Sequence, residues 1–250
     1  MELAGRTILV TGASSGIGRE ASVVLAELGA SLVLVGRRRE ELERTAAALE
    51  PGEHRVEPFD LMELDAIPEW LKDVAARVGV LDDLVHSAGV HFTLPLRATG
   101  ARQYGDLMRV NVDAAYFLVK GFRQKGVRRS GSGSGVVFLS SVMGLIGQTG
   151  ITAYSTSKGA LVSMARSLAL ELAREGIRVN CVAPGVVRTK MAANAEQVLT
   201  PDQYQAIESL HPLGIGTPRD AAYAIAFLLA ETGRWITGTT LVVDGGYTAQ

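Results

Sequence analysis

Short runs of apolar residues alternate along this chain with longer segments in which apolar positions recur every three to four residues. The short runs are typical of buried strands, and the longer segments have the period of helices that pack on one face. We predict strands over residues 6–11, 31–35, 55–59, 83–87, 136–140, 177–182 and 239–243, and helices over 17–29, 39–49, 65–78, 100–125, 153–175 and 219–231. Such alternation predicts one α/β domain over residues 1–250, with a parallel sheet and a ligand site at the carboxyl ends of its strands.

The composition narrows the function classes. Hydrophobic residues make up 47% and charged residues 20% of the chain, which is typical of a soluble globular protein. A net charge of −1 provides no field that would attract nucleic acid, and the longest apolar run, residues 221–230, is too short to span a membrane. The single cysteine, Cys181, cannot form an internal disulfide, which favours a cytoplasmic location. No metal site is expected, because metal-ligand spacing is absent among His54, His86, His91 and His211.

A glycine-rich turn follows the first predicted strand. The segment Gly12-Ala13-Ser14-Ser15-Gly16-Ile17-Gly18 joins that strand to the first predicted helix. Backbone N–H groups and the dipole at a helix N-terminus attract phosphate, and glycine permits a positive φ or the close approach of a ligand. The spacing is G-x-x-x-G-x-G and not the commoner G-x-G-x-x-G. The turn therefore predicts a dinucleotide site, and the alternative is a plain tight turn between strand and helix.

Tyr154 and Lys158 lie four residues apart in the predicted helix 153–175, so their side chains share one face. A free tyrosine titrates near about 10, which is too high for a proton donor and acceptor at neutral pH. We expect the Lys158 cation to lower the pKa of Tyr154 toward the range useful for general acid–base catalysis. Taken alone, the pair is equally compatible with a half-buried tyrosine beside a solvated lysine.

Both sites together resemble the short-chain dehydrogenase/reductase family, over essentially the whole chain from Thr7 to Tyr247. The family's T-G-x-x-x-G-x-G corresponds to Thr11 to Gly18 and its Y-x-x-x-K to Tyr154 to Lys158. Further matches are Ser141, thirteen positions before the tyrosine, Asn111 in a central helix, the P-G-x-x-x-T segment Pro184 to Thr189, and the ending Val243-Asp244-Gly245-Gly246. One departure is His86-Ser87-Ala88-Gly89, where the family usually has N-N-A-G.

The resemblance implies a Rossmann-like, doubly wound, seven-stranded parallel sheet with helices on both faces. It implies an oxidoreductase that interconverts a ketone and a secondary alcohol, and a homotetramer. Tyr154 would transfer the proton, Lys158 would lower the Tyr154 pKa and hold the nicotinamide ribose, and Ser141 would bind the substrate oxygen. Asn111 would kink its helix and hold a water that links Lys158 to solvent, whereas Ser140 would be structural. The resemblance assigns cofactor binding to Gly12, Ser14, Ser15, Gly16, Ile17, Gly18, Arg37, Arg38, Asp60, Leu61, Ala88, Gly89, Tyr154, Lys158, Pro184, Gly185, Val187 and Thr189.

The end of the second strand bears on the choice of cofactor. An acidic residue there would accept hydrogen bonds from the adenosine ribose of NAD, whereas arginine accommodates the 2′-phosphate of NADP. This chain has Gly36 followed by Arg37 and Arg38, so we predict that NADP(H) is preferred and that NAD(H) is possible, with Ser15 as a helper. Asp60 resembles the family residue that contacts the adenine amino group. In the alternative, the arginines only pair with Glu40, Glu41 and Glu43.

Two other functions fit parts of the sequence. Gly12-Ala13-Ser14-Ser15-Gly16 matches the G-x-S-x-G pattern of a serine hydrolase, with Ser14 as nucleophile. That elbow needs an oxyanion loop from an earlier strand, and no earlier strand is predicted. A module that senses a dinucleotide without chemistry is the third reading, although such proteins tend to lose the tyrosine or the lysine.

The substrate is only partly indicated. The family's variable substrate loop corresponds to residues 190–216, and an apolar pocket wall is predicted from Met143, Leu145, Ile146, Met191 and Leu199. The segment His211-Pro212-Leu213-Gly214 resembles the corresponding segment of 3-oxoacyl-carrier-protein reductases. The expected substrate is a small carbonyl or alcohol compound, either free or linked to an acyl carrier. A basic run near the end of the predicted helix 100–125 has two interpretations: it binds an acidic carrier protein, or it is a solvated helix end. The run consists of Arg123, Lys125, Arg128 and Arg129. Residues 130–135, which alternate Ser and Gly, predict a flexible loop.

Overall fold

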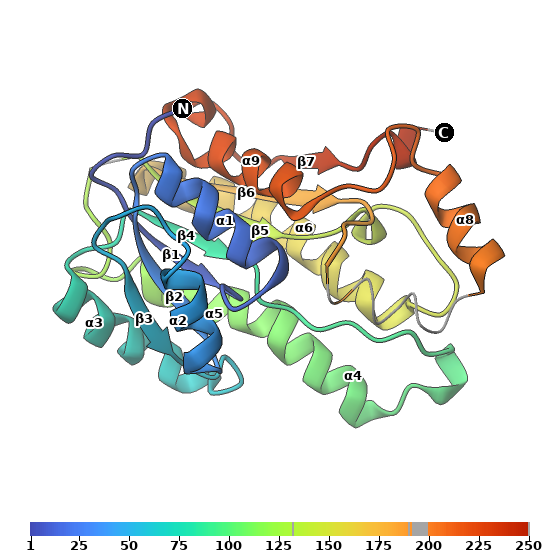
Figure 1. Ribbon diagram of the computed structural model, residues 1–250. Helices are drawn as coiled ribbons and strands as arrows, with labels where there is room; N and C mark the ends of the chain where they lie inside the picture. The colour runs from blue at the N-terminus through green and yellow to red at the C-terminus, as the bar shows by residue number, and fades with distance from the viewer. Residues whose placement is uncertain (132, 190, 192–199, 250) are drawn as a thin grey trace.

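A computed structural model describes residues 1–131, 133–189, 191 and 200–249. Its centre is a seven-stranded parallel sheet in the order β3-β2-β1-β4-β5-β6-β7, which confirms the predicted fold class (Figure 1). The order reverses between β1 and β4, so a crevice opens at the carboxyl ends of these two strands. The strands are β1 Thr7–Thr11, β2 Ser31–Gly36, β3 Arg55–Pro58, β4 Asp83–His86, β5 Ser134–Leu139, β6 Ile177–Pro184 and β7 Thr240–Val243.

Helices cover both faces of the sheet. The α-helices are α1 Gly16–Glu27, α2 Arg39–Ala46, α3 Ile67–Val78, α4 Ala101–Met108, α5 Ala114–Phe122, α6 Thr152–Leu172, α8 Pro201–Ser209 and α9 Pro218–Leu229. One core lies under α3, α5 and α6, and the other lies under α1, α2 and α9, with α1 beside α9 in Figure 1. No helix among the described residues is long and apolar enough to cross a membrane.

Side chains of each strand alternate between these two cores. In β1, Leu9 points into the core of α3, α5 and α6, whereas Ile8 and Val10 point into the core of α1 and α9. Successive residues of a strand face opposite sides of its sheet, so a strand that is covered on both faces is apolar throughout. This explains why the strands appear in the sequence as continuous apolar runs.

A buried ion pair joins the amino ends of the central strands. Arg6 donates two hydrogen bonds of 2.7 Å to the carboxylate of Asp83, which also accepts a bond of 2.6 Å from the backbone N–H of Gly135. Burial raises the pKa of Asp83 to about 6, although the hydrogen bonds and charge of Arg6 oppose this rise. The cluster fixes β1, β4 and β5 against one another at the end of the sheet opposite the crevice.

Two predictions of secondary structure were wrong, and one helix was missed. The predicted helix 100–125 is interrupted by a π-helical turn, Arg109–Asp113, between α4 and α5. The predicted loop 130–135 overlaps β5 at Ser134 and Gly135, because Asp83 binds the Gly135 backbone and draws it into the sheet. Helix α8 was not predicted at all, since its sequence lacks a strong apolar period. Of the predicted substrate region 190–216, residues 190 and 192–199 lie outside the described residues, and Leu199 is among them.

Candidate active site

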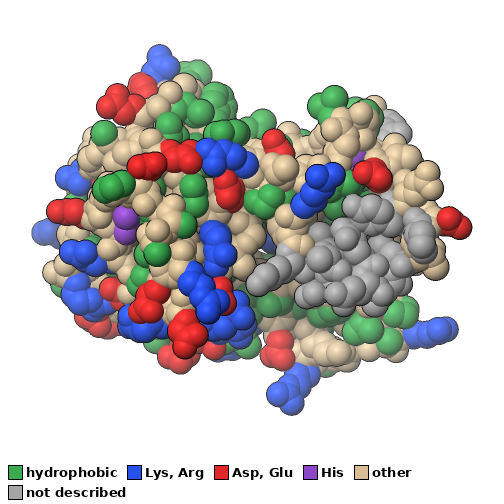
Figure 2. Space-filling view, in the orientation of Figure 1, with side chains coloured by type: hydrophobic (Ala, Val, Ile, Leu, Met, Phe, Trp, Pro, Cys, Tyr) green, Lys and Arg blue, Asp and Glu red, His purple; other side chains and the backbone are tan. Residues whose placement is uncertain are grey.

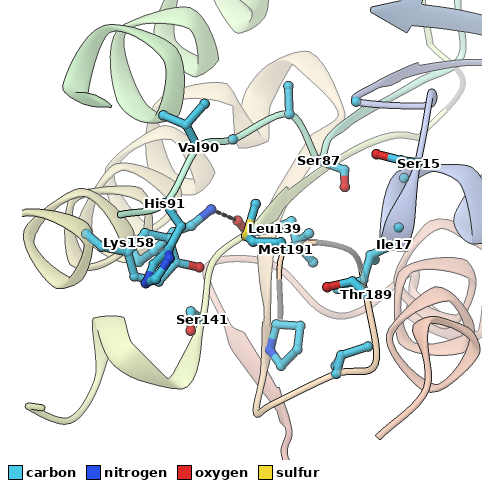
Figure 3. Close-up of a pocket in the computed structure, with 18 of the residues that line it drawn as sticks. Ser15, Ile17, Ser87, Val90, His91, Leu139, Ser141, Lys158, Thr189 and Met191 are labelled. Carbon is cyan, nitrogen blue, oxygen red and sulfur yellow. Dashed lines mark hydrogen bonds between the residues drawn. The ribbon is translucent and has the colours of Figure 1, made fainter. Parts of the chain in front are cut away.

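A cavity of about 850 Å³ opens at the carboxyl ends of the strands. Segments that follow β1, β2, β3, β4, β5 and β6 line it, and with them every described residue that the sequence assigned to cofactor or catalysis except Asn111. In Figure 3, Ser15, Ile17 and Thr189 lie toward one end of the cavity, and His91, Ser141 and Lys158 lie toward the other. The volume suits an extended ligand, since ligand pockets commonly enclose about 300–1,000 Å³.

The glycine-rich turn has the form that a dinucleotide requires. Gly12 has a φ of 70°, and a Cβ atom at this position would lie 2.7 Å from the backbone nitrogen of Ala88. Helix α1 begins at Gly16, and the side chain of its N-cap residue, Ser15, makes no capping hydrogen bond. A helix N-terminus that its own side chains leave open presents N–H groups to an anion. The turn therefore fits the pyrophosphate of a dinucleotide.

The arginines after β2 face the same cavity. Arg37 and Arg38 are exposed and line its rim, and Figure 2 shows a group of basic side chains interleaved with acidic ones in the region of α2. Among the described residues, no ion pair joins either arginine to Glu40, Glu41 or Glu43. Glu43 pairs with Arg39 at 3.7 Å, and Glu41 pairs with Arg19 and Arg44. The arrangement leaves two guanidinium groups available at the cavity. Asp60 and Leu61 line the neighbouring wall.

The unusual segment His86-Ser87-Ala88-Gly89 braces the crevice through Thr11. Thr11 Oγ1 accepts a hydrogen bond of 3.2 Å from the Ala88 N–H and lies 3.1 Å from His86 Nδ1. Burial, helped by the charge of Lys158, lowers the pKa of His86 to about 3, so this imidazole is neutral. A Cβ atom on Gly89 would lie 3.3 Å from Asn111 Oδ1 and 3.5 Å from Lys158 Nζ. Ala88 and Gly89 are small and keep the crevice open. The His86 side chain connects β4 to β1 through its contact with Thr11.

Tyr154, Lys158 and Ser141 converge at the inner end of the cavity. Lys158 Nζ lies 5.6 Å from the centroid of the Tyr154 ring, as their spacing on α6 requires, and donates a bond of 2.7 Å to the Leu139 carbonyl (Figure 3). Ser141 lies beside the Tyr154 side chain, and its Oγ accepts a hydrogen bond of 3.2 Å from the Met143 N–H. Its neighbour Ser140 donates instead to the backbone carbonyl of Lys158 at 2.9 Å, which is a structural contact.

The pKa values at this end differ from the sequence expectation. Burial raises the pKa of Tyr154 to about 12, and the neighbouring Ser141 hydroxyl opposes the rise only in part. The expectation that Lys158 lowers this pKa is therefore wrong for the protein without ligands, because removal of the phenol from water outweighs its neighbours. Burial also lowers the pKa of Lys158, to about 8. Tyr154 is thus held as a protonated phenol at neutral pH.

Asn111 lies in the π-helical turn and is fully buried. Its amide oxygen accepts a bond of 2.8 Å from the Val90 N–H, and its amide nitrogen donates to the Val90 carbonyl and to Ser157 Oγ, each at 3.0 Å. The predicted kink of this helix thus takes the form of a π turn, a distortion that is frequent at functional sites. The amide connects the segment after β4 to α6.

The segment after β6 closes the cavity from the opposite side. Pro184, Gly185, Val187 and Thr189 line it, and Thr189 approaches Gly16 of the glycine-rich turn. His211 supports this segment because its Nε2 accepts a hydrogen bond of 3.1 Å from the Val186 N–H. The two predicted cofactor segments therefore face each other.

Comparisons with known proteins agree with this geometry. A family model described as enoyl-(acyl carrier protein) reductase matches residues 12–248. The chain is 36% identical to glucose 1-dehydrogenase of Gluconobacter oxydans, over 98% of this chain and 92% of that protein. It is 34% identical to a 3-oxoacyl-(acyl-carrier-protein) reductase of Rickettsia prowazekii, over 98% of each. A short-chain type dehydrogenase/reductase from Mycobacterium ulcerans superposes with a TM-score of 0.91 at 28% identity, over 100% of this chain and 92% of that one.

The chain belongs to the short-chain dehydrogenase/reductase family. As a member of this family, it is an oxidoreductase that acts on CH–OH or C=O groups with a nicotinamide dinucleotide. The serine hydrolase alternative has no support in this short-chain dehydrogenase/reductase, because no hydrogen bond joins Ser14 to a histidine in the described part of the chain. Within the same residues, no cluster of His, Cys, Asp and Glu could hold a metal ion.

The predicted substrate wall of this dehydrogenase/reductase was only partly right. Met143 and Met191 line the cavity, but Leu145 and Ile146 do not: Leu145 is exposed, and Ile146 packs against the cluster of Val142, Met143 and Ile151. Of the basic run, Arg123 pairs with Glu175 and Arg129 with Asp82, so half of its charges are neutralised. Sequence reasoning missed several residues that line the cavity. The sequence offers a signal for two of them, His91 and Thr93, which lie close to Gly89; the others are Gln148, Ile151 and Tyr247.

Proposed function

We propose that this protein is an NADP(H)-dependent enzyme that interconverts a ketone and a secondary alcohol through Ser141, Tyr154, Lys158 and Asn111. The observation that supports the proposal best is the convergence of Tyr154, Ser141 and Lys158 at one end of a cavity whose other end is a glycine-rich turn. When bound, the nicotinamide supplies or accepts the hydride. The residues of the chain bind the substrate and move its proton.

Tyr154 is the proton donor in the direction of reduction. Its phenol is protonated at neutral pH, which is the form that donates to a carbonyl oxygen, but the pKa raised by burial weakens it as an acid, so donation depends on groups that stabilise the phenolate. Ser141 lines the cavity beside Tyr154, so its hydroxyl can donate to the same substrate oxygen and stabilise the negative charge that develops there. During oxidation the proton moves in reverse, from the alcohol to the phenolate.

Lys158 and Asn111 support this transfer. The Lys158 ammonium is buried 5.6 Å from the phenol ring, and it stabilises the phenolate that remains after proton donation. One of its N–H groups is bound by the Leu139 carbonyl, and the others are available for the ribose hydroxyls of the cofactor. Asn111 holds the segment beside this site, and we retain the proposal that a water bound there links Lys158 to solvent.

The decisive experiment is Tyr154→Phe, measured with NADPH and a panel of ketones. Removing a positioned acid costs about 10²–10⁴ in rate, so the variant should lose nearly all turnover while the Kd for NADPH stays within about threefold. Tyr104→Phe, which changes an exposed tyrosine on α4 outside the cavity, is the matched control and should behave as wild type. Wild-type kcat in Tyr154→Phe would refute the mechanism. Tight NADPH binding without turnover by the wild type would favour the dinucleotide-sensing alternative.

The assembly belongs to the same proposal. Leu170 of α6 and Tyr116 of α5 are large side chains that are 83% and 52% exposed, and contact with another copy of the chain would bury them. We propose a homotetramer with two-fold axes that buries such positions. We propose further that the enzyme acts on a small molecule in the cytoplasm, where the buried Cys181 would remain a free thiol. Sedimentation at micromolar concentration should show the tetramer, and monomer alone would refute it.

A further inference from the structure

His91 differs from the other histidines in its hydrogen bonds. His54, His86 and His211 each have a partner: a ring nitrogen of His54 accepts from the Leu32 N–H, His86 lies against Thr11, and His211 accepts from Val186. Within the described residues, neither ring nitrogen of His91 has a protein partner, although the side chain is more than half buried. The ring nitrogens of His91 are not closed off from solvent, so water or a ligand in the cavity can bind them.

The position of this ring is defined by the catalytic tyrosine. His91 follows β4 by five residues and packs at 86° against Tyr154, with the ring centroids 4.7 Å apart. It lines the cavity next to Lys158 and Ser141 (Figure 3). A substrate whose reacting oxygen meets Tyr154 must therefore bring its neighbouring atoms past the edge of His91.

The surroundings of His91 are mostly apolar. Val142, Met143 and Ile151 form a small buried cluster with Tyr154, and Tyr247 packs against it. These residues line the same end of the cavity. A mostly apolar pocket with a few polar groups fixes the orientation of its ligand through those groups, and His91 is one that lies against Tyr154.

We propose that His91 determines substrate specificity by hydrogen-bonding a second, uncharged oxygen close to the reacting carbon, as in a hydroxyketone or a 3-oxo ester. This inference rests on the proposed function and specifies its substrate class.

The charge state of His91 supports an uncharged partner. Burial and the nearby Lys158 ammonium lower the pKa of His91, so the imidazole is neutral at pH 7. A neutral imidazole has one donor and one acceptor nitrogen, which suits a hydroxyl or a second carbonyl. It offers no ion pair to a carboxylate or a phosphate. The recognition is therefore through hydrogen bonding and shape.

The experiment compares two ketones of similar length, ethyl 3-oxobutanoate and 2-octanone, of which only the first has a second oxygen near the ketone. Wild type should favour the 3-oxo ester in kcat/KM by about tenfold, the value of one neutral hydrogen bond. His91→Phe keeps a ring against Tyr154 but removes both nitrogens, and it should bring the ratio near one by lowering kcat/KM for the ester. His54→Phe makes the same change outside the cavity and should keep the wild-type ratio.

Binding provides a readout that does not require turnover. The Tyr154→Phe protein loaded with NADPH should bind the 3-oxo ester about tenfold more tightly than 2-octanone in calorimetry, and adding His91→Phe should abolish the difference. His91→Gln retains a donor and an acceptor and should retain part of it. Should His91→Phe lower kcat/KM equally for both ketones, the residue only positions Tyr154 and the inference is overturned while the proposed function stands. If no ketone binds or reacts, the proposed function itself fails.

Discussion

The preference for NADPH over NADH depends on Arg37 and Arg38, and removal of one guanidinium tests it. Both arginines line the cavity without an ion-pair partner among the described residues. A charge-assisted hydrogen bond to a 2′-phosphate contributes about 1.5–3 kcal/mol. Because both side chains are exposed, solvent screening places the value near the lower limit. We therefore expect Arg37→Ala to raise the Kd for NADPH about tenfold.

The assay is a fluorescence titration of each variant with NADPH and with NADH. Arg37→Ala should leave the Kd for NADH within about twofold, since NADH has no 2′-phosphate to lose. The neighbouring Arg39 pairs with Glu43 and does not line the cavity, so Arg39→Ala is the matched control and should bind both cofactors as wild type does. Raising the salt concentration should reduce the effect of Arg37→Ala.

Two results would refute this reasoning. One is a wild-type protein that binds NADH more tightly than NADPH. The other is an Arg37→Ala variant that weakens both cofactors equally. Gly36→Asp offers the reverse test, because a carboxylate would repel the phosphate and accept bonds from the ribose of NADH. Its Cβ would lie 3.3 Å from Leu42 Cδ2, so Leu42 must shift by a few tenths of an ångström.

Two further predictions concern stability. Asp83→Asn should lower the free energy of unfolding by about 3 kcal/mol in urea titrations, because it leaves the Arg6 charge without its buried partner. Lys72→Ala, in the exposed pair with Glu69, should lower the same free energy by less than about 1 kcal/mol. Similar losses in the two variants would contradict the role of burial. The pKa of Lys158 falls from 10.5 to about 8 on folding, so between these values the unfolded chain binds more protons and stability rises with pH. Relative to Lys158→Met, wild type should gain up to about 3 kcal/mol from pH 8 to 10.5, and a constant difference would exclude the shift.

The sequence predicted best what the backbone determines locally. The Gly12 turn and the i, i+4 spacing of Tyr154 and Lys158 are matters of φ and helical period, so they could be placed without tertiary information. The fold class followed from the same periods. These features were predicted correctly because each depends on residues that are neighbours in the chain.

Features that depend on distant packing were missed. The pKa of Tyr154 was expected to fall, but it rises because burial depends on residues from several elements. Leu145 and Ile146 have the same apolar character as Met143, and only tertiary packing decides which of them lines the cavity. His91 contacts Tyr154 across more than sixty positions of sequence, a contact that no local pattern specifies.

The hydrogen bonds of Asn111 affect how variants of this residue should be interpreted. One amide holds Val90, the neighbour of His91, and also Ser157, the neighbour of Lys158. An aspartate at this position could still accept from the Val90 N–H, but it could not donate to the other two groups. Substrate affinity and the rate of proton transfer would then change together. Loss of activity in Asn111→Asp is therefore no evidence for a water relay unless the geometry around His91 is shown to be intact.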